Sequence, residues 1–180
     1  IFYHFRYCHP NKHNKSFKDV LHNAKKLGYA ESNPSADLNG DDVAAKLKIL
    51  ASLCFNSFLN HNIHVEGIRN IDKTDIDNAN KLGYKIKLIG YSEFINNKIY
   101  QRVHPTLIKK NSYVASIDGV LNAVIIEGKP VGQSIIQGEG AGPAATTSAL
   151  VSDISSILRG NIKFPFSIPN KERKNLKFND

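Results

Sequence analysis

The chain has 180 residues, of which 41% are hydrophobic, and this is enough apolar content for the core of one domain. The formal net charge of +8 is spread along the chain, with one concentration at 171–177, so the composition argues against a nucleic-acid-binding protein. We expect a cytoplasmic protein, since no apolar run spans a membrane, no signal peptide is recognisable and two cysteines make no disulfide framework.

The first third of the chain is predicted to be mainly helical. Residues 1–15 show no periodicity. Ser16 is an N-cap candidate for a helix that Gly28 would end. Residues 29–39 contain several turn-forming residues and are predicted to be a loop. A second helix is predicted over about 41–55, because apolar residues recur there at helical spacing.

The rest of the chain is predicted to be mainly strands. A short strand at 63–68 precedes a short helix that Thr74 would cap and Gly83 would end. Two hairpins follow, with strands at 84–94 and 98–108, and at 120–127 and 131–137. A final helix is predicted over about 144–158. This order predicts an α+β fold with a mostly antiparallel or mixed sheet and helices packed on one face.

The segment 31–46 (ESNPSADLNGDDVAAK) places three acids close to a lysine at the start of the second helix. Asp42 and Lys46 are four residues apart and share a helical face. Ile49 and Leu53 continue this stripe, so we expect the pair to lie at the head of a face that enters the core. Such charges are costly unless used, which favours a functional site over a surface ion pair. The acids are Glu31, Asp37 and Asp42. The neighbouring stripe, also predicted to be core, is Val43, Leu47, Leu50 and Cys54. The water-facing stripe is Asp41, Ala45, Lys48 and Ser52.

Other candidate sites carry weaker signals. The glycine-rich loop 138–142 lies between a strand and a helix, where phosphates are often bound, but it lacks the spacing of a dinucleotide or P-loop motif. A tight turn and a ligand contact therefore both remain open, and Thr146 and Thr147 would add hydroxyl donors. His104 is expected to be structural. A metal site is not expected at the spacing of Cys8, His9 and His13.

Six segments carry a family resemblance, and they occur in the family's order. They are LGYAESNPSADLNGDDVAAKLKILA at 27–51, VEGI at 65–68, LGYKIKLIGY at 82–91, VHPTLI at 103–108, SIDGVLNAVIIEG at 116–128 and GEGAGPAATTSALVSDI at 138–154. Through them, residues 16–160 resemble the catalytic and dimerisation domain of homoserine dehydrogenase. The resemblance implies three parts, namely a non-matching start at 1–15, this domain at 16–160 and a linker-like tail at 161–180.

The resemblance implies a reaction and roles for five residues. The family interconverts L-aspartate 4-semialdehyde and L-homoserine in threonine and methionine biosynthesis. Glu31 and Asp42 would bind the amino-acid substrate, and Asp37 and Tyr29 match further active-site positions. Lys46 would donate or accept the proton of the reacting oxygen, which agrees with the chemistry of an ammonium beside a developing alkoxide.

The resemblance also implies a cofactor and a second copy of the chain. Gly142 would approach NAD or NADP, with Thr146 beside it, and the family's nicotinamide-binding Rossmann motif does not occur in the 180 residues. We therefore expect the chain by itself to show little or no turnover, and we expect a homodimer. The alternative is a non-catalytic dimerising module that needs a separate nucleotide-binding domain.

Overall fold

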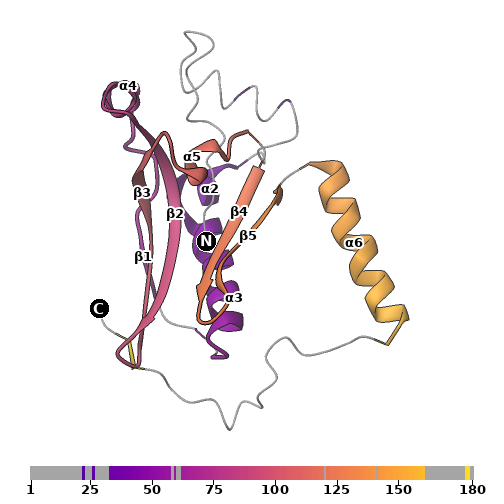
Figure 1. The fold of residues 1–180 in the computed structure, drawn as a ribbon. Coiled ribbons are helices and arrows are strands. Elements are labelled where there is room, and N and C mark those ends of the chain that lie inside the picture. The colour runs from indigo at the N-terminus through magenta and orange to yellow at the C-terminus, as the bar shows by residue number, and fades with distance from the viewer. Residues whose placement is uncertain are drawn as a thin grey trace.

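The computed structural model describes residues 33–57, 59, 62–119, 121–140, 142–160 and 177–178, together with His22 and Lys26, which are helical. A four-stranded sheet forms one layer of the molecule (Figure 1). Its strands are β1 (His64–Val65), β2 (Tyr84–Ile95), β3 (Lys98–Lys109) and β6 (Lys177–Phe178). The order is β1-β3-β2, and β6 also pairs with β3. Strands β2 and β3 are antiparallel, whereas β1 and β6 run parallel to β3.

The β2–β3 hairpin is confirmed almost to the residue. Its twelve pairs run from Tyr84 opposite Lys109 to Ile95 opposite Lys98. Asn96 and Asn97 form the turn with φ values of 51° and 64°. Two consecutive left-handed residues match the right-handed twist of a hairpin, and asparagine tolerates this conformation better than most residues.

Helix α3 (Asp41–Cys54) lies on one face of this sheet, and the short helix α2 (Ser35–Asn39) precedes it. The predicted loop at 29–39 is therefore wrong for its last five residues, because burial of Leu38, 5% exposed, holds that segment in a helical turn. The main core cluster consists of Leu38, Val43, Ala44, Leu47, Ile68, Leu88 and Val103. A smaller cluster consists of Ala51, Leu59 and Ile99. These contacts attach α3 to the sheet along its length.

The buried face of α3 is rotated away from the predicted one. Ile49 and Leu53 are 56% and 43% exposed, so the stripe that begins with Asp42 and Lys46 does not enter the core of this chain. Cys54 is exposed too. Ser52, expected to face water, is buried and accepts a 3.1 Å hydrogen bond from the Leu59 backbone N–H. The buried residues of the helix are Val43, Ala44, Leu47, Ala51 and Ser52.

Helix α4 (Lys73–Lys81) begins one residue before the predicted cap. Asp72, rather than Thr74, is the N-cap, and its carboxylate accepts a 2.9 Å hydrogen bond from the Asp75 N–H. The Asp75 carboxylate in turn accepts a 3.0 Å bond from the Asp72 N–H, which completes a capping box. The acidic pair satisfies two backbone donors, and this decides where the helix starts.

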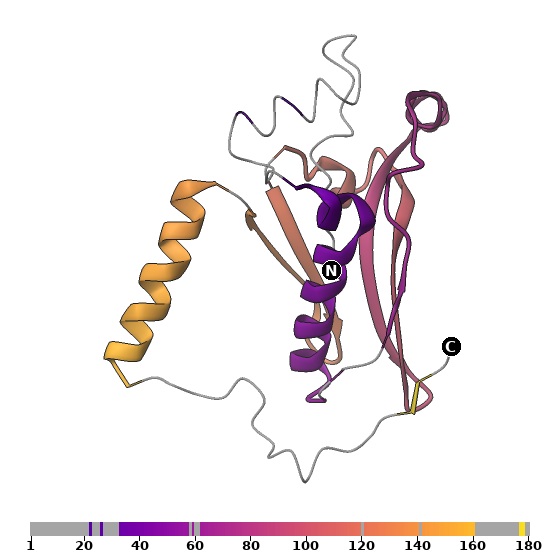
Figure 2. The same ribbon diagram turned by 180° about the vertical axis from the view of Figure 1, so that it is seen from behind.

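The remaining elements form a second hairpin and a separate helix. Helix α5 (Tyr113–Ser116) connects β3 to the hairpin of β4 (Leu121–Gly128) and β5 (Gly132–Glu139), and α6 (Pro143–Leu158) follows. Neither α5 nor β6 was expected. Every residue of β5 is exposed and none of α6 is buried. Helix α6 stands apart from the sheet in both views (Figures 1 and 2). The α+β fold class is confirmed, and no helix among the described residues is long and apolar enough to cross a membrane.

Candidate functional site

A tight turn at Gly40 joins α2 to α3 and connects the two helices that carry Asp37 and Asp42. Gly40 adopts φ of +87°, a conformation that favours glycine, and its N–H donates a 3.3 Å hydrogen bond to the Asp37 carbonyl. Its carbonyl accepts from the Ala44 N–H at 3.0 Å and so begins α3. A Cβ at Gly40 would lie 3.1 Å from Val65 Cγ1, which leaves little room for any side chain. The turn therefore places Asp37 and Asp42 on successive helices with Gly40 between them.

The loop after β1 fixes α2 to the sheet. The Ile68 N–H donates a 2.9 Å hydrogen bond to the Leu38 carbonyl, and the Glu66 N–H donates at 2.8 Å to the Val103 carbonyl of β3. Gly67 lies against the end of α2, where a Cβ would overlap the Leu38 carbonyl and lie 2.6 Å from Asn39 Cα. The VEGI segment thus links the helix that carries Asp37 to the central sheet.

Asp42 and Lys46 form the ion pair that their spacing predicts. Lys46 Nζ donates to Asp42 Oδ2 at 2.6 Å, within the first two turns of α3. The two side chains are 43% (Lys46) and 30% (Asp42) exposed, so the pair lies at the edge of the buried face. A half-exposed ammonium held by a carboxylate can meet a solute from solvent, and it combines a proton donor with an anionic partner for a cation.

The other predicted substrate ligands are only partly described. Asp37 is half-buried at the middle of α2. Glu31 and Tyr29 lie outside the described residues, as do Cys8, His9 and His13. Within the described ranges, no group of three or more His, Cys, Asp or Glu side chains is arranged to hold a metal ion.

The two predicted cofactor residues contact each other at the start of α6. Gly142 has φ of +121° and is the N-cap of the helix. The Thr146 hydroxyl donates a 3.0 Å hydrogen bond to the Gly142 carbonyl, so it supports the glycine. No side-chain hydrogen bond caps the helix, and Pro143 occupies its first turn. Helices α3 and α6 begin toward the same end of the molecule but stand apart (Figures 1 and 2).

A charged cluster that the sequence analysis missed lies between β2 and residues 113–118, which comprise α5 and the two residues after it and are called the α5 segment below. Lys85 Nζ donates to Asp118 Oδ2 at 2.7 Å and to the Ala115 carbonyl at 2.8 Å. Lys87, only 2% exposed, donates to the Ile117 carbonyl and lies 3.3 Å from Asp118 Oδ1. Burial lowers the pKa of the Lys87 ammonium from its ordinary value, and the Asp118 carboxylate opposes that shift. The two amines thus share one carboxylate, and each also donates a hydrogen bond to a backbone carbonyl.

The sequence does contain a signal for this cluster. Lys85 and Lys87 alternate with apolar residues in a strand, so they share one face of β2. Nothing local pairs them, because Asp118 is more than thirty residues away. His104, by contrast, has its Nδ1 close to two neighbours in sequence, 3.0 Å from the Pro105 carbonyl oxygen and 3.2 Å from Thr106 Oγ1.

Comparison with known proteins decides the family. The family model described as homoserine dehydrogenase matches residues 4–155. The chain belongs to the homoserine dehydrogenase family. The homoserine dehydrogenase of Neisseria gonorrhoeae is 43% identical over 145 residues, which are 80% of this chain and 33% of that protein. The chain thus spans about a third of the length of the curated relatives it matches.

Solved homoserine dehydrogenase structures share this fold. The enzyme from Thiobacillus denitrificans superposes with a TM-score of 0.81 at 34% identity, covering 96% of this chain and 42% of that one. A hyperthermophilic archaeal homoserine dehydrogenase mutant in complex with NADPH gives a TM-score of 0.60 at 25% identity, covering 81% of this chain and 41% of that one. The family match over residues 4–155 includes Asp42, Lys46 and Gly142.

Proposed function

We propose that the chain supplies the substrate-binding and catalytic part of a homoserine dehydrogenase, which interconverts L-aspartate 4-semialdehyde and L-homoserine with NAD or NADP. The observation that carries the proposal is the 2.6 Å pair of Lys46 and Asp42 at the solvent edge of α3. Family membership supports the same reaction. The chain covers a third of the length of the Neisseria gonorrhoeae relative, and we propose that the complete reaction also needs the part of the enzyme that the match does not include.

Lys46 is the proposed proton carrier. Reduction of the aldehyde turns its oxygen into an alkoxide, and the Lys46 ammonium would stabilise and protonate that oxygen. In the reverse direction the neutral amine would take the hydroxyl proton. Asp42 holds Lys46 in place and would share the substrate's ammonium with Asp37 and Glu31, since carboxylates are the natural partners of that group.

The glycine loop and the start of α6 fit a nicotinamide cofactor. Gly142 has a backbone conformation that side chains rarely adopt, and Gly138 has no other group within 4 Å of the Cβ position. The first turn of α6 has no side-chain cap, so its backbone N–H groups face an anion favourably. When bound, the cofactor supplies or accepts the hydride. Gly142 and Thr146 would hold it, and the chain's own contribution to the chemistry remains the proton at Lys46.

We also propose that two copies of the chain associate. Strand β5 is exposed along all eight residues and α6 has no buried residue, although both carry large apolar side chains. Exposed strands and apolar helix faces of this kind are usually covered by another chain or domain. The exposed apolar residues on these elements include Ile135, Ile136, Leu150, Val151, Ile154 and Ile157.

The decisive experiment uses a chimera that joins the chain to the rest of the Neisseria gonorrhoeae relative. We expect NADP-dependent oxidation of homoserine by this chimera. Lys46→Ala should lower kcat by about 100-fold or more, the usual contribution of a positioned proton carrier. Lys48→Ala, on the same helix, is the control and should keep kcat within about twofold. Circular dichroism would establish that all variants fold.

Two outcomes would count against the proposal. A chimera that folds and binds NADPH but does not oxidise homoserine would favour the non-catalytic module. An unchanged kcat for Lys46→Ala would remove that residue from the chemistry. Calorimetric titration of homoserine into the 180-residue chain tests substrate binding separately, and Asp42→Asn should weaken it. We expect little or no turnover from the 180 residues alone, because the glycine loop would be only one side of the cofactor site.

A further inference from the structure

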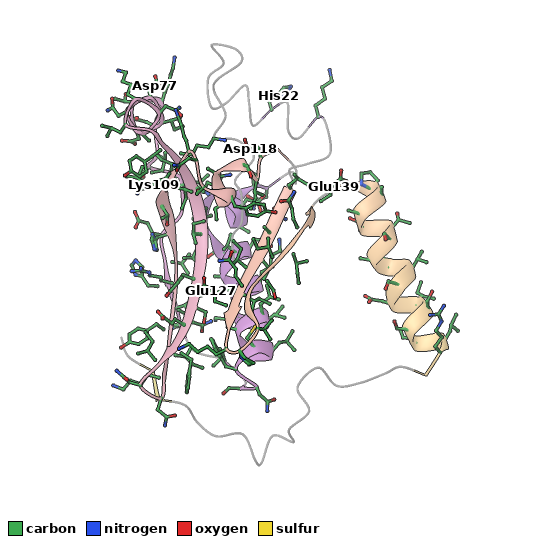
Figure 3. The ribbon with its side chains drawn as sticks, viewed as in Figure 1. His22, Asp77, Lys109, Asp118, Glu127 and Glu139 are labelled. Atoms are coloured by element: carbon green, nitrogen blue, oxygen red, sulfur yellow. The ribbon has the colours of Figure 1, made fainter. Side chains whose placement is uncertain are left out.

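The first residues of β4 run alongside the glycine loop. Leu121 pairs with Glu139 and Asn122 with Gly138, so the first two residues of the glycine loop belong to β5 and Gly140 follows the strand directly. Figure 3 shows Asp118 and Glu139 at this end, whereas Glu127 lies toward the other. A side chain at the start of β4 can therefore contact the residue that follows β5.

The Asn122 carboxamide occupies the space beside Gly140. An ideal Cβ at Gly140 would overlap Asn122 Nδ2 and would lie 3.0 Å from Oδ1. Asn122 is directly opposite Gly138, so Gly140 is its diagonal neighbour across the ladder. By contrast, a Cβ at Gly138 would meet nothing within 4 Å. Of these two positions, only 140 has a neighbouring side chain in the space where a Cβ would lie.

The strand that carries Asn122 is itself anchored at its start. The Leu121 N–H donates a 3.4 Å hydrogen bond to the Asp118 carbonyl, and Lys85 and Lys87 bind the Asp118 carboxylate. On the other strand, the Tyr113 hydroxyl donates to Gln137 Oε1 at 2.7 Å. Both strands are therefore tied to the α5 segment just before the loop. Because these hydrogen bonds hold the ends of β4 and β5, the Asn122 side chain has a fixed position beside Gly140.

We propose that Asn122 is a positioning residue for the glycine loop, whose carboxamide beside Gly140 sets the path on which the loop approaches the nicotinamide cofactor. The identity of the ligand in this inference rests on the proposed function, whereas the contact between Asn122 and Gly140 is observed in this chain. A loop held in the binding conformation loses less entropy when a ligand binds, so removing the carboxamide should weaken cofactor binding specifically.

The contact is tested first in the 180-residue chain by thermal unfolding. Gly140→Ala should lower Tm because the methyl group displaces the carboxamide, whereas Gly138→Ala should leave Tm nearly unchanged. Combining Gly140→Ala with Asn122→Ala should restore part of the lost Tm, since the overlap is gone. A double variant no more stable than Gly140→Ala would overturn the contact.

The positioning role is tested in the chimera by NADPH fluorescence titration. Asn122→Ala should raise the NADPH Kd about tenfold, the cost of ordering roughly one further residue on binding, and leave the homoserine KM unchanged. The double variant should keep the raised Kd although its Tm recovers. Gly128→Ala, at the far end of the hairpin, is the control. An unaltered NADPH Kd in Asn122→Ala would overturn the inference. A chimera that binds NADPH without oxidising homoserine would overturn only the proposed function.

Discussion

Individual residues in this chain owe their properties to partners far away in sequence. Lys87 is an ordinary lysine in a strand by its local sequence, yet it is 2% exposed and bonded to the Ile117 carbonyl. Burial of an ammonium is costly unless a carboxylate and carbonyls replace its water. Asp118 and the end of α5 provide this replacement, and only the folded chain brings them to β2.

The lowered pKa of Lys87 predicts a pH-dependent contribution to stability. In the unfolded chain this pKa is 10.5, whereas burial lowers it in the folded chain. Between the two values the unfolded chain binds more protons, so the free energy of unfolding should rise with pH through that window. The slope from one proton is at most about 1.4 kcal/mol per pH unit.

Replacing Lys87 with Met isolates this contribution. Urea unfolding of both chains across alkaline pH should show the wild type gaining stability relative to Lys87→Met, with no further gain above 10.5. The variant should fold, because Asp118 keeps its 2.7 Å bond to Lys85. Lys81→Met, which removes an exposed lysine, is the control. A difference that is constant with pH would contradict the prediction.

At the scale of elements, helix ends depend on which side chain satisfies the first backbone N–H groups. The sequence analysis expected Thr74 to cap α4. Asp72 is the cap, since its partner Asp75 lies three residues later and completes the reciprocal bonds. Two acids at the positive end of a helix are also favourable electrostatically.

Substitution of Asp72 and of Thr74 tests this assignment. Asp72→Ala should destabilise the chain by about 0.5–2 kcal/mol, the usual cost of losing an N-cap. Asp72→Asn keeps an acceptor and should remain close to wild type. Thr74→Ala should be nearly neutral. Chemical denaturation measures all three, and a larger loss for Thr74→Ala than for Asp72→Ala would refute the assignment.

At the scale of the whole molecule, two of the described elements, β5 and α6, leave large apolar side chains exposed. The sheet and α3 share a core, whereas β5 and α6 expose their apolar residues. Burial of apolar area is the main driving force for association, so these surfaces predict a complex. Ile49 and Leu53, expected in the core, add exposed apolar area on α3.

Sedimentation velocity at micromolar concentration tests the proposed dimer. We expect the 180-residue chain to sediment as a dimer. Ile136→Lys, at a β5 position that is 64% exposed, should shift it toward monomer because a charge would have to be buried. Asn78→Lys adds the same charge on α4 and should not. A wild-type monomer, or equal effects of both substitutions, would contradict the proposal.

Local sequence alone determined the elements whose signals are short-range. The asparagine turn, the two long hairpins, the start of α3 at Asp41 and the Asp42–Lys46 spacing all follow from residues within a few positions of each other. The motif order also determined the family. Turn-forming residues and helical periodicity involve residues only a few positions apart, so they predict local structure before the tertiary fold is known.

Tertiary structure alone decided which faces are buried and which distant charges meet. The face of α3 that enters the core is the one whose side chains pack against residues of the sheet and of the loop after β1. The contact of Lys87 with Asp118 joins two residues that are 31 positions apart in sequence. Such contacts form only when the chain is closed into long loops, so their energy is a property of the whole fold.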